Sequence, residues 1–119
     1  MATFKSPVKT NIGTDETLMY SAPDTIASAI VIGLTVSNTS DRLLEATIWL
    51  QKPGGDSAHI VKNAPLVRGG TLVLSGGDQK IAMEPEDEIR VYMRDPDDLD
   101  AEETLSGLAD GIISILERQ

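Results

Sequence analysis

The amino-acid sequence predicts an all-β protein built as a single antiparallel β-sandwich of about eight strands. Apolar residues recur in short runs, and several of these runs alternate with polar residues as strands do. Glycine, proline and aspartate separate the runs at regular intervals, which is typical of the turns in a sandwich. No series of helical segments of the kind that a parallel βαβ sheet needs is predicted.

The length of 119 residues suits one domain with one hydrophobic core. The chain contains no cysteine, so neither a disulfide framework nor a cysteine-ligated metal site is expected. We expect residues 1–15 to form an extended N-terminal arm and residues 16–119 to form the sandwich domain.

The arm is predicted from the pattern of its apolar residues. Phe4, Val8 and Ile12 are spaced by four, which would suit a helix, but Pro7 and Gly13 argue for an extended segment. These three side chains are too widely spaced to form a strong strand of the sandwich. We therefore expect residues 2–15 to become fully ordered against a neighbouring subunit.

Four strands are predicted between residues 17 and 61. They cover residues 17–20, residues 25–36, the amphipathic run from Leu44 to Leu50, and Ala58 to Val61, and a kink follows at residues 63–65. Within the second strand we expect one face to carry Ile30, Ile32, Leu34 and Val36. Gly33 indicates a β-bulge or close packing.

Residues 65–93 carry the clearest strand pattern in the chain. Strands are predicted at Thr71–Leu74, at Lys80–Met83 and from Glu88 onward, with Gly76-Gly77-Asp78 as a turn. Alternation in the last of these strands places three apolar side chains on one face. The expected common core is Ile89, Val91, Met93, Ile48 and Leu50, and the expected exposed residues are Arg90, Glu45 and Lys80.

The C-terminal part combines an acidic loop with an ambiguous tail. Six acids lie between Asp95 and Glu103. In the tail, apolar residues recur at helical spacing, but two glycines and the run Ile112-Ile113-Ser114-Ile115 favour a strand. We expect a strand from Gly111 to Glu117 and allow a helical turn around Ala101 to Leu108. The arrangement as a whole is expected to be immunoglobulin-like or jelly-roll-like.

Several of these segments, in this order, resemble small β-sandwich virion proteins of tailed bacteriophages. The similar pieces are Tyr20-Ser21-Ala22-Pro23, Ala29 to Val36, Ser37-Asn38-Thr39, the Gly-Gly-Thr strand at Gly69, Lys80-Ile81-Ala82-Met83, Glu84-Pro85-Glu86-Asp87, and Ile112 to Glu117. The corner before Asp87 usually has a glycine where this chain has Glu86. The resemblance implies a capsid decoration protein or a neck or tail accessory protein, which is present in several copies in the virion and assembled in the host cytoplasm.

Candidate chemical sites are few. Ser57 and His59, the only histidine, lack a third group to orient them, and the acids sit in loops without an aromatic platform. Asp98, Asp100 and Glu102 alternate as cation ligands do, but the rest of an EF-hand loop is missing. The Gly69-Gly70 and Gly76-Gly77 pairs join strands and do not open a helix, so they do not predict a phosphate site. We expect no enzyme activity, no catalytic residue, no cofactor and no metal.

The charge and hydropathy of the chain restrict its partners. A net charge of -9 argues against direct binding of nucleic acid, and no apolar run is long enough to cross a membrane or act as an export signal. The expected partners are further copies of the chain and other virion proteins. A carbohydrate-binding module for host recognition, centred on Trp49 or Tyr92, is an alternative, although aromatic residues make up only 3% of the chain.

Overall fold

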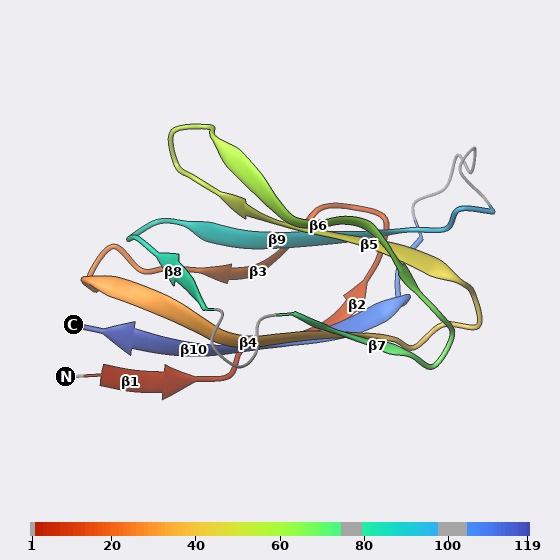
Figure 1. Cartoon of the computed structure of the whole chain (residues 1–119), viewed down its shortest axis with the longest axis horizontal. Coiled ribbons are helices and arrows are strands. Elements are labelled where there is room, and N and C mark those ends of the chain that lie inside the picture. Colours follow the sequence, from red (N-terminus) through yellow and green to blue (C-terminus); the bar gives the residue numbers. More distant parts are fainter. Residues whose placement is uncertain (1, 75–79, 98–104) are drawn as a thin grey trace.

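The structure is a computed structural model, which describes residues 2–74, 80–97 and 105–119. The described residues form ten strands and no helix, so the predicted all-β class is confirmed (Figure 1). The strands are β1 (Ala2–Lys5), β2 (Val8–Ile12), β3 (Thr17–Ser21), β4 (Ser28–Asn38), β5 (Leu44–Gln51), β6 (Ser57–Leu66), β7 (Thr71–Leu74), β8 (Ile81–Met83), β9 (Glu88–Arg94) and β10 (Ala109–Arg118).

Two antiparallel sheets form the predicted sandwich. The six-stranded sheet has the order β1-β10-β4-β7, with β2 also paired to β10 and β8 also paired to β4. The four-stranded sheet has the order β3-β9-β5-β6. Figure 1 shows the two sheets as separate layers, with the N- and C-terminal ends of the chain close together at one end.

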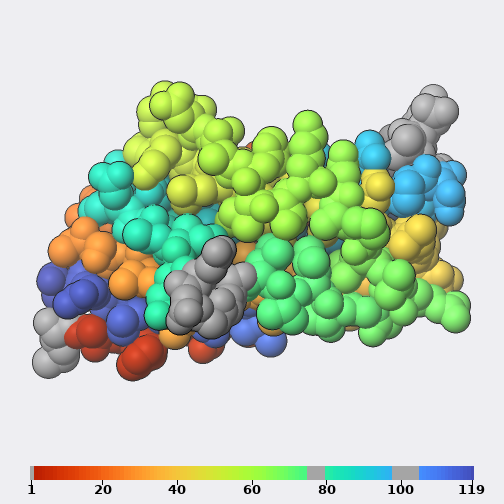
Figure 2. Space-filling model, in the orientation of Figure 1, coloured from red at the N-terminus to blue at the C-terminus, as the bar shows by residue number. Residues whose placement is uncertain are grey.

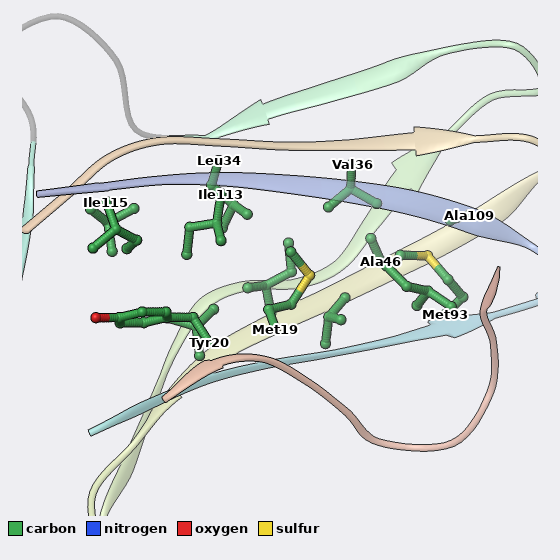
Figure 3. Close-up of a cluster of buried hydrophobic side chains, with 14 of the residues drawn as sticks. Met19, Tyr20, Leu34, Val36, Ala46, Met93, Ala109, Ile113 and Ile115 are labelled. Atoms are coloured by element: carbon green, nitrogen blue, oxygen red, sulfur yellow. The ribbon is translucent and has the colours of Figure 1, made fainter. Parts of the chain in front are cut away.

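The core lies between the sheets and takes apolar side chains from both (Figure 3). Ile48, Ile89, Val91 and Met93 are fully buried there as predicted, and Leu50 packs against them while half-buried. Lys80 is exposed as predicted.

Arg90 and Glu45 are half-buried and not exposed as expected. Both lie on the outer face of the four-stranded sheet, where each forms an ion pair with a neighbouring side chain.

The predicted face of β4 is partly wrong because of a bulge. Pairing with β10 moves from Gly33–Ser114 to Val31–Ile115, which leaves Ile32 as an extra residue. Leu34 and Val36 are buried as expected, but beyond the bulge Val31 is buried and Ile30 is only half-buried. A bulge shifts the alternation by one residue, so the two halves of β4 follow opposite parity.

The N-terminal segment is extended, but it pairs within its own chain. Strands β1 and β2 lie along β10, with Lys5 opposite Ile115 and Val8 opposite Ile112. Ile12 is fully buried, which corrects the expectation that the apolar residues of the arm find no place in the sandwich. The reason is that β10 offers an unpaired edge. The division at residue 15 stays a prediction.

Two residues other than glycine adopt a left-handed conformation at positions that the sequence analysis singled out. Glu86 adopts a left-handed conformation with φ of 73° although it is not glycine. Asn63 has φ of 52°, at the predicted kink, and β6 continues through it to Leu66.

The tail strand is confirmed as β10, which also extends the prediction by two residues to Ala109 and by one to Arg118. Residues 105–108 are not helical. The turn at Gly76-Gly77-Asp78, the acids Asp98, Asp100 and Glu102, and residues 101–104 of the allowed helical turn lie outside the described residues.

Candidate functional site

The outer face of the six-stranded sheet carries two rows of mostly apolar side chains, each running across four strands. Cross-strand partners point to the same side of a sheet, so the pairing register defines the rows. Residues on even positions of β10 point outward because residues 109, 111, 113, 115 and 117 are buried. We call the two rows together the apolar face; they are Phe4–Leu116–Ile30–Ala82 and Val8–Ile112–Thr35–Val73.

The apolar side chains in these rows are unusually exposed. Phe4 is 73% exposed, Val73 67%, Val8 61% and Ile112 48%. Scattered exposed apolar residues are normal on a protein surface, but a contiguous exposed patch is typical of an interaction site. The sheet register makes Val8 and Ile112 direct cross-strand partners, although they are 104 positions apart in the sequence. Val73 lies in the same row, across Thr35, and Phe4 lies in the other row, four residues along β10 and opposite Leu116.

The strands that carry this face are poor in acids. Residues 2–12 and 109–118 contain Lys5, Lys9 and Arg118 against only Asp110 and Glu117, whereas the whole chain has ten cations and nineteen acids. The negative charge of the protein is therefore concentrated elsewhere. A partner that approaches the β1–β2–β10 side of the sheet does not meet that charge at close range.

A buried polar contact links this edge to the opposite sheet. Glu117 on β10 points into the sandwich, and the Tyr20 hydroxyl on β3 donates a hydrogen bond of 2.6 Å to its Oε2 atom. Lys5 Nζ lies 2.9 Å from its Oε1 atom. The Glu117 side chain is only 3% exposed.

These contacts shift the pKa of both acidic groups. The hydrogen bond from Tyr20, followed by the contacts with Lys5, holds the pKa of Glu117 below its usual value despite burial. Burial, and then the neighbouring carboxylate of Glu117, raises the pKa of Tyr20. The pair is therefore a neutral phenol that donates to an ionised carboxylate.

The outer face of the four-stranded sheet is different, because its charges are paired with one another. Arg94 on β9 forms an ion pair with Glu45 on β5. Arg90 Nη2 lies 2.7 Å from Glu88, and its Nη1 atom lies 3.8 Å from Glu16. The Thr47 hydroxyl and Asn63 are also linked, since the Asn63 backbone N–H donates to Thr47 Oγ1 over 3.0 Å.

The aromatic residues of this second face are closely packed. The ring of Trp49 lies 5.8 Å from the ring of Tyr92 and 6.3 Å from that of His59. Its Nε1–H donates to Gln51 Oε1 over 3.2 Å. Trp49 is only 7% exposed, so its ring offers little surface on which a sugar could stack.

The residues that sequence analysis considered for nucleophilic catalysis are placed on the same strand. Ser57 and His59 are both exposed on β6, and the aromatic contact of His59 is with Trp49. Among the described residues, no hydrogen bond joins the two side chains and no cluster of histidine and carboxylate groups could hold a metal ion. Sequence reasoning found these residues, and the structure does not assemble them into a site.

One end of the sandwich has an open groove of about 610 Å³. It is lined by Ser21, Ala22, Pro23, Asp24, Gln51, Lys52, Pro53, Gly55, Glu86 and Glu88. Lys52 Nζ forms ion pairs with Asp87 at 2.6 Å and with Glu84 at 3.1 Å. The hydrogen bonds that it donates to these two carboxylates raise the pKa of Lys52. Lys52, the cation among the residues that line the groove, is therefore already paired with two acids of the chain segment that joins β8 to β9.

The described part of the acidic loop is also internally bonded. The backbone N–H of Asp97 donates to Asp95 Oδ1 over 2.9 Å, and Arg42 Nη1 lies 2.8 Å from Asp95 Oδ2. These contacts lower the pKa of Asp95. The loop therefore begins as a turn fixed by an ion pair.

Comparison with solved structures finds similar sandwiches in viral proteins. A chain of infectious bursal disease virus, Gx strain, has a TM-score of 0.55 and 14% identity over 98% of this chain and 32% of that chain. The VP2 protein in derived T=1 particles of that virus has a TM-score of 0.54 and 16% identity over 97% of this chain and 31% of that chain. The VP2 chain of the subviral particle has a TM-score of 0.53 and 18% identity over 98% of this chain and 32% of that chain.

These likenesses define the fold. Identities this low show a shared fold alone, and the chain spans about a third of the length of the viral chains. No family model and no curated protein matches the sequence. None of the described residues belongs to a helix that could cross a membrane. The chain thus has a β-sandwich fold that also occurs in VP2 of infectious bursal disease virus.

Proposed function

We propose that this protein is a non-enzymatic structural component of a tailed-phage virion, which docks in multiple copies on the capsid surface. The observation that carries the proposal is the apolar face, on which Phe4, Val8, Val73 and Ile112 are all about half exposed or more. Covering such a face removes apolar area from water and stabilises a complex by roughly 25 cal/mol per Å² before the costs of association.

The occupant we assign to this face is a larger shell protein of the same particle. The sandwiches of similar fold belong to viral chains about three times as long, two of them described as VP2 in particles. The scarcity of acids around the face allows a shell protein to approach it without meeting most of the negative charge of this chain. In a symmetric particle many such contacts act together, so each can be weak.

Neck or tail attachment is the second placement, since the same face could cover a neck or tail protein. In both placements, the partners are further copies of the chain and other virion proteins, and the protein makes no direct contact with nucleic acid. Assembly takes place in the bacterial host cytoplasm in either case. A map of the assembled particle distinguishes them, because decoration repeats over the capsid lattice whereas neck and tail proteins lie on its unique axis.

A matched pair of substitutions tests the docking surface. Val8 on the apolar face and Val67 outside it are both 61% exposed valines. We expect Val8→Ser to weaken each docking contact by about 1 kcal/mol, roughly fivefold in affinity, because it removes apolar area from the contact. Quantitative mass spectrometry of purified particles measures the number of copies that are incorporated.

Val67→Ser is the control, since it makes the same chemical change at the same exposure on a different surface. Its incorporation should match that of the parent, while Val8→Ser, alone or with Ile112→Ser, should be depleted from particles. Equal incorporation of all the variants would show that docking uses another surface. Absence of the parent protein from purified particles would overturn the virion role itself.

A further inference from the structure

Strand β1 is attached to the domain by an unusually small set of contacts. All four of its residues are exposed, and Phe4, at 73%, contributes nothing to the core. Its attachment consists of the backbone pairing with residues 115–118 of β10, together with the ion pair of Lys5. On its other side, the same stretch of β10 pairs with β4, which supplies four buried apolar residues to the core.

The segment that follows β1 is anchored much more firmly. In β2, Ile12 is fully buried, and its carbonyl accepts a hydrogen bond of 3.0 Å from the backbone N–H of Leu108. The carbonyl of Gly13 accepts a bond of 2.8 Å from Met93. Release of β1 would therefore leave β2 in place.

Ser6 and Pro7 form a natural hinge between the two strands. The register against β10 is unbroken across them, because Lys5 faces Ile115 and Val8 faces Ile112. Pro7 has no N–H to donate, and its carbonyl accepts the 3.0 Å bond from Ile113. The chain can therefore turn away before Pro7 while the bond at Pro7 holds β2 on the edge.

If β1 left the edge of β10, the charge of Glu117 would determine which strand could pair with that edge in its place. Glu117 is 3% exposed and has its pKa held low, and among the described residues Lys5 is the cation within ion-pair distance of it. Loss of that cation leaves a buried carboxylate without its positive partner, which is unfavourable. A suitable strand must therefore extend along residues 115–118 and present a cation at the position of Lys5.

We propose that β1 exchanges between copies of this protein, so that β1 of one copy pairs with β10 of a second copy and brings its Lys5 to that copy's Glu117. The exchanged contact between β1 and β10 has the same residues and register as the contact within one chain. A second copy is therefore a partner whose β1 matches the β10 edge. A strand of four residues reaches about 13 Å from the hinge, so the two β10 edges must face each other closely. The contact would join neighbouring copies whatever particle they belong to.

Single cysteines provide a direct test, because the chain contains no cysteine of its own. Phe4 on β1 lies opposite Leu116 on β10, at a cross-strand spacing that a disulfide can bridge. Full-length Phe4→Cys protein is mixed with full-length Leu116→Cys protein under mild oxidation. The two proteins carry tags of different size, so the mixed dimer is resolved from the like dimers on a non-reducing gel.

The control mixture combines Thr35→Cys with Val73→Cys, which are also opposite each other on the outer face but belong to β4 and β7. Exchange of β1 predicts that the first mixture gives a severalfold higher yield of mixed dimer than the control. Equal yields would overturn the proposal. If Leu116→Cys lowers the melting temperature, Ala2→Cys with Arg118→Cys repeats the test at an exposed pair.

A second measurement tests the part played by Lys5. Adding Lys5→Ala to the Phe4→Cys variant alone should lower the yield of mixed dimer severalfold, because its β1 then brings no cation to Glu117 of the second copy. Lys9→Ala in the same variant removes a nearby exposed cation on β2 that forms none of the ion pairs described, and should leave the yield unchanged. An unchanged yield with Lys5→Ala would show that the ion pair does not select the exchanged strand.

Discussion

The outer faces of the two sheets differ in how their side chains are satisfied. On the four-stranded sheet, Arg94 is paired with Glu45, Arg90 is paired with Glu88, and Trp49 is covered by its neighbours. On the six-stranded sheet, the corresponding surface is the apolar face, whose residues Phe4 and Val8 lack comparable cover. The charges and the Trp49 ring of the first face are paired or covered within the chain, whereas the apolar side chains of the second face remain exposed.

This difference indicates where the protein interacts. Water solvates a face of paired charges well, and the pairs would have to be desolvated before another protein could cover them. An apolar face gains from being covered. In the space-filling view, the yellow-green atoms of the turn between β5 and β6 and of the start of β6 project from one end of the molecule (Figure 2). The asymmetry between the faces therefore favours docking through the six-stranded sheet.

The largest expected effect comes from adjacent isoleucines on β10 that point to opposite sides. Ile113 is fully buried and Ile112 is 48% exposed. Ile113→Asp should destabilise the fold by several kcal/mol, because it places an unpaired charge in the core. Ile112→Asp should cost about 1 kcal/mol or less, since its side chain is already partly in water. Urea unfolding of both variants measures the difference.

Ile89→Asp is the counterpart on the four-stranded sheet and should behave like Ile113→Asp, since Ile89 is also fully buried. Similar losses for Ile112→Asp and Ile113→Asp would contradict the assignment of an open outer face. An Ile89→Asp protein that melts like the parent would contradict the assignment of the core.

The second effect concerns Glu117, the buried acid of the six-stranded sheet. Glu117→Gln should cost about 2 kcal/mol at neutral pH, because Tyr20 and Lys5 lose a charged partner. The folded pKa of Glu117 lies below its unfolded value of about 4.3. Its contribution is therefore fully present above that value and is lost as the pH falls through the folded pKa.

Urea unfolding at pH 7 and near pH 3 tests the sign. The difference in unfolding free energy between parent and Glu117→Gln should be larger at pH 7 than at pH 3. Tyr20→Phe removes the main cause of the lowered pKa, so the carboxyl resonance of Glu117 should titrate at higher pH in that variant. A constant difference across the pH range would mean that the carboxylate has the same pKa folded and unfolded.

The sequence was sufficient for much of the sandwich because alternation is local information. The pattern around Ile89, Val91 and Met93 depends only on neighbouring residues, and it identified the buried face correctly. The face of β4 was mistaken although Gly33 indicated a bulge or close packing, because only the pairing with β10 shows that Ile32 is the extra residue and that the alternation reverses there. The left-handed turn at Glu86 likewise depends on tertiary bonds, since Glu86 N–H donates to the Ala22 carbonyl over 2.8 Å.

The candidate site was harder to predict for the same reason. Sequence analysis recognised that Phe4 and Val8 lacked a place in the core, but it did not connect them with Ile112 or Val73. Val8, Ile112 and Val73 fall in one row, and Phe4 in the other, only when β1, β2, β10, β4 and β7 are paired. The exposed Ile112 beside the buried Ile113 was a local signal, because a strand with a single buried face rarely carries two consecutive large apolar residues.

The third effect is smaller and concerns the charged face of the four-stranded sheet. A double-mutant cycle with Arg94→Ala and Glu45→Ala should give a coupling energy of about 0.5–1 kcal/mol, because both side chains are partly exposed. The coupling should fall as salt is added. Neither substitution should change the incorporation of the protein into particles, and a large loss of incorporation would show that this face also docks.

The smallest effect on stability is expected at Phe4. Because this side chain is 73% exposed, Phe4→Ser should change the free energy of unfolding by no more than about 0.5 kcal/mol. It should nevertheless shorten retention on a hydrophobic-interaction column, since a large part of the apolar face disappears. Leu18→Ser on the four-stranded sheet, where Leu18 is 39% exposed beside Arg90, should shorten it much less. Equal shifts would mean that the two faces are equally apolar to an approaching surface, and the inferred asymmetry between them would be wrong.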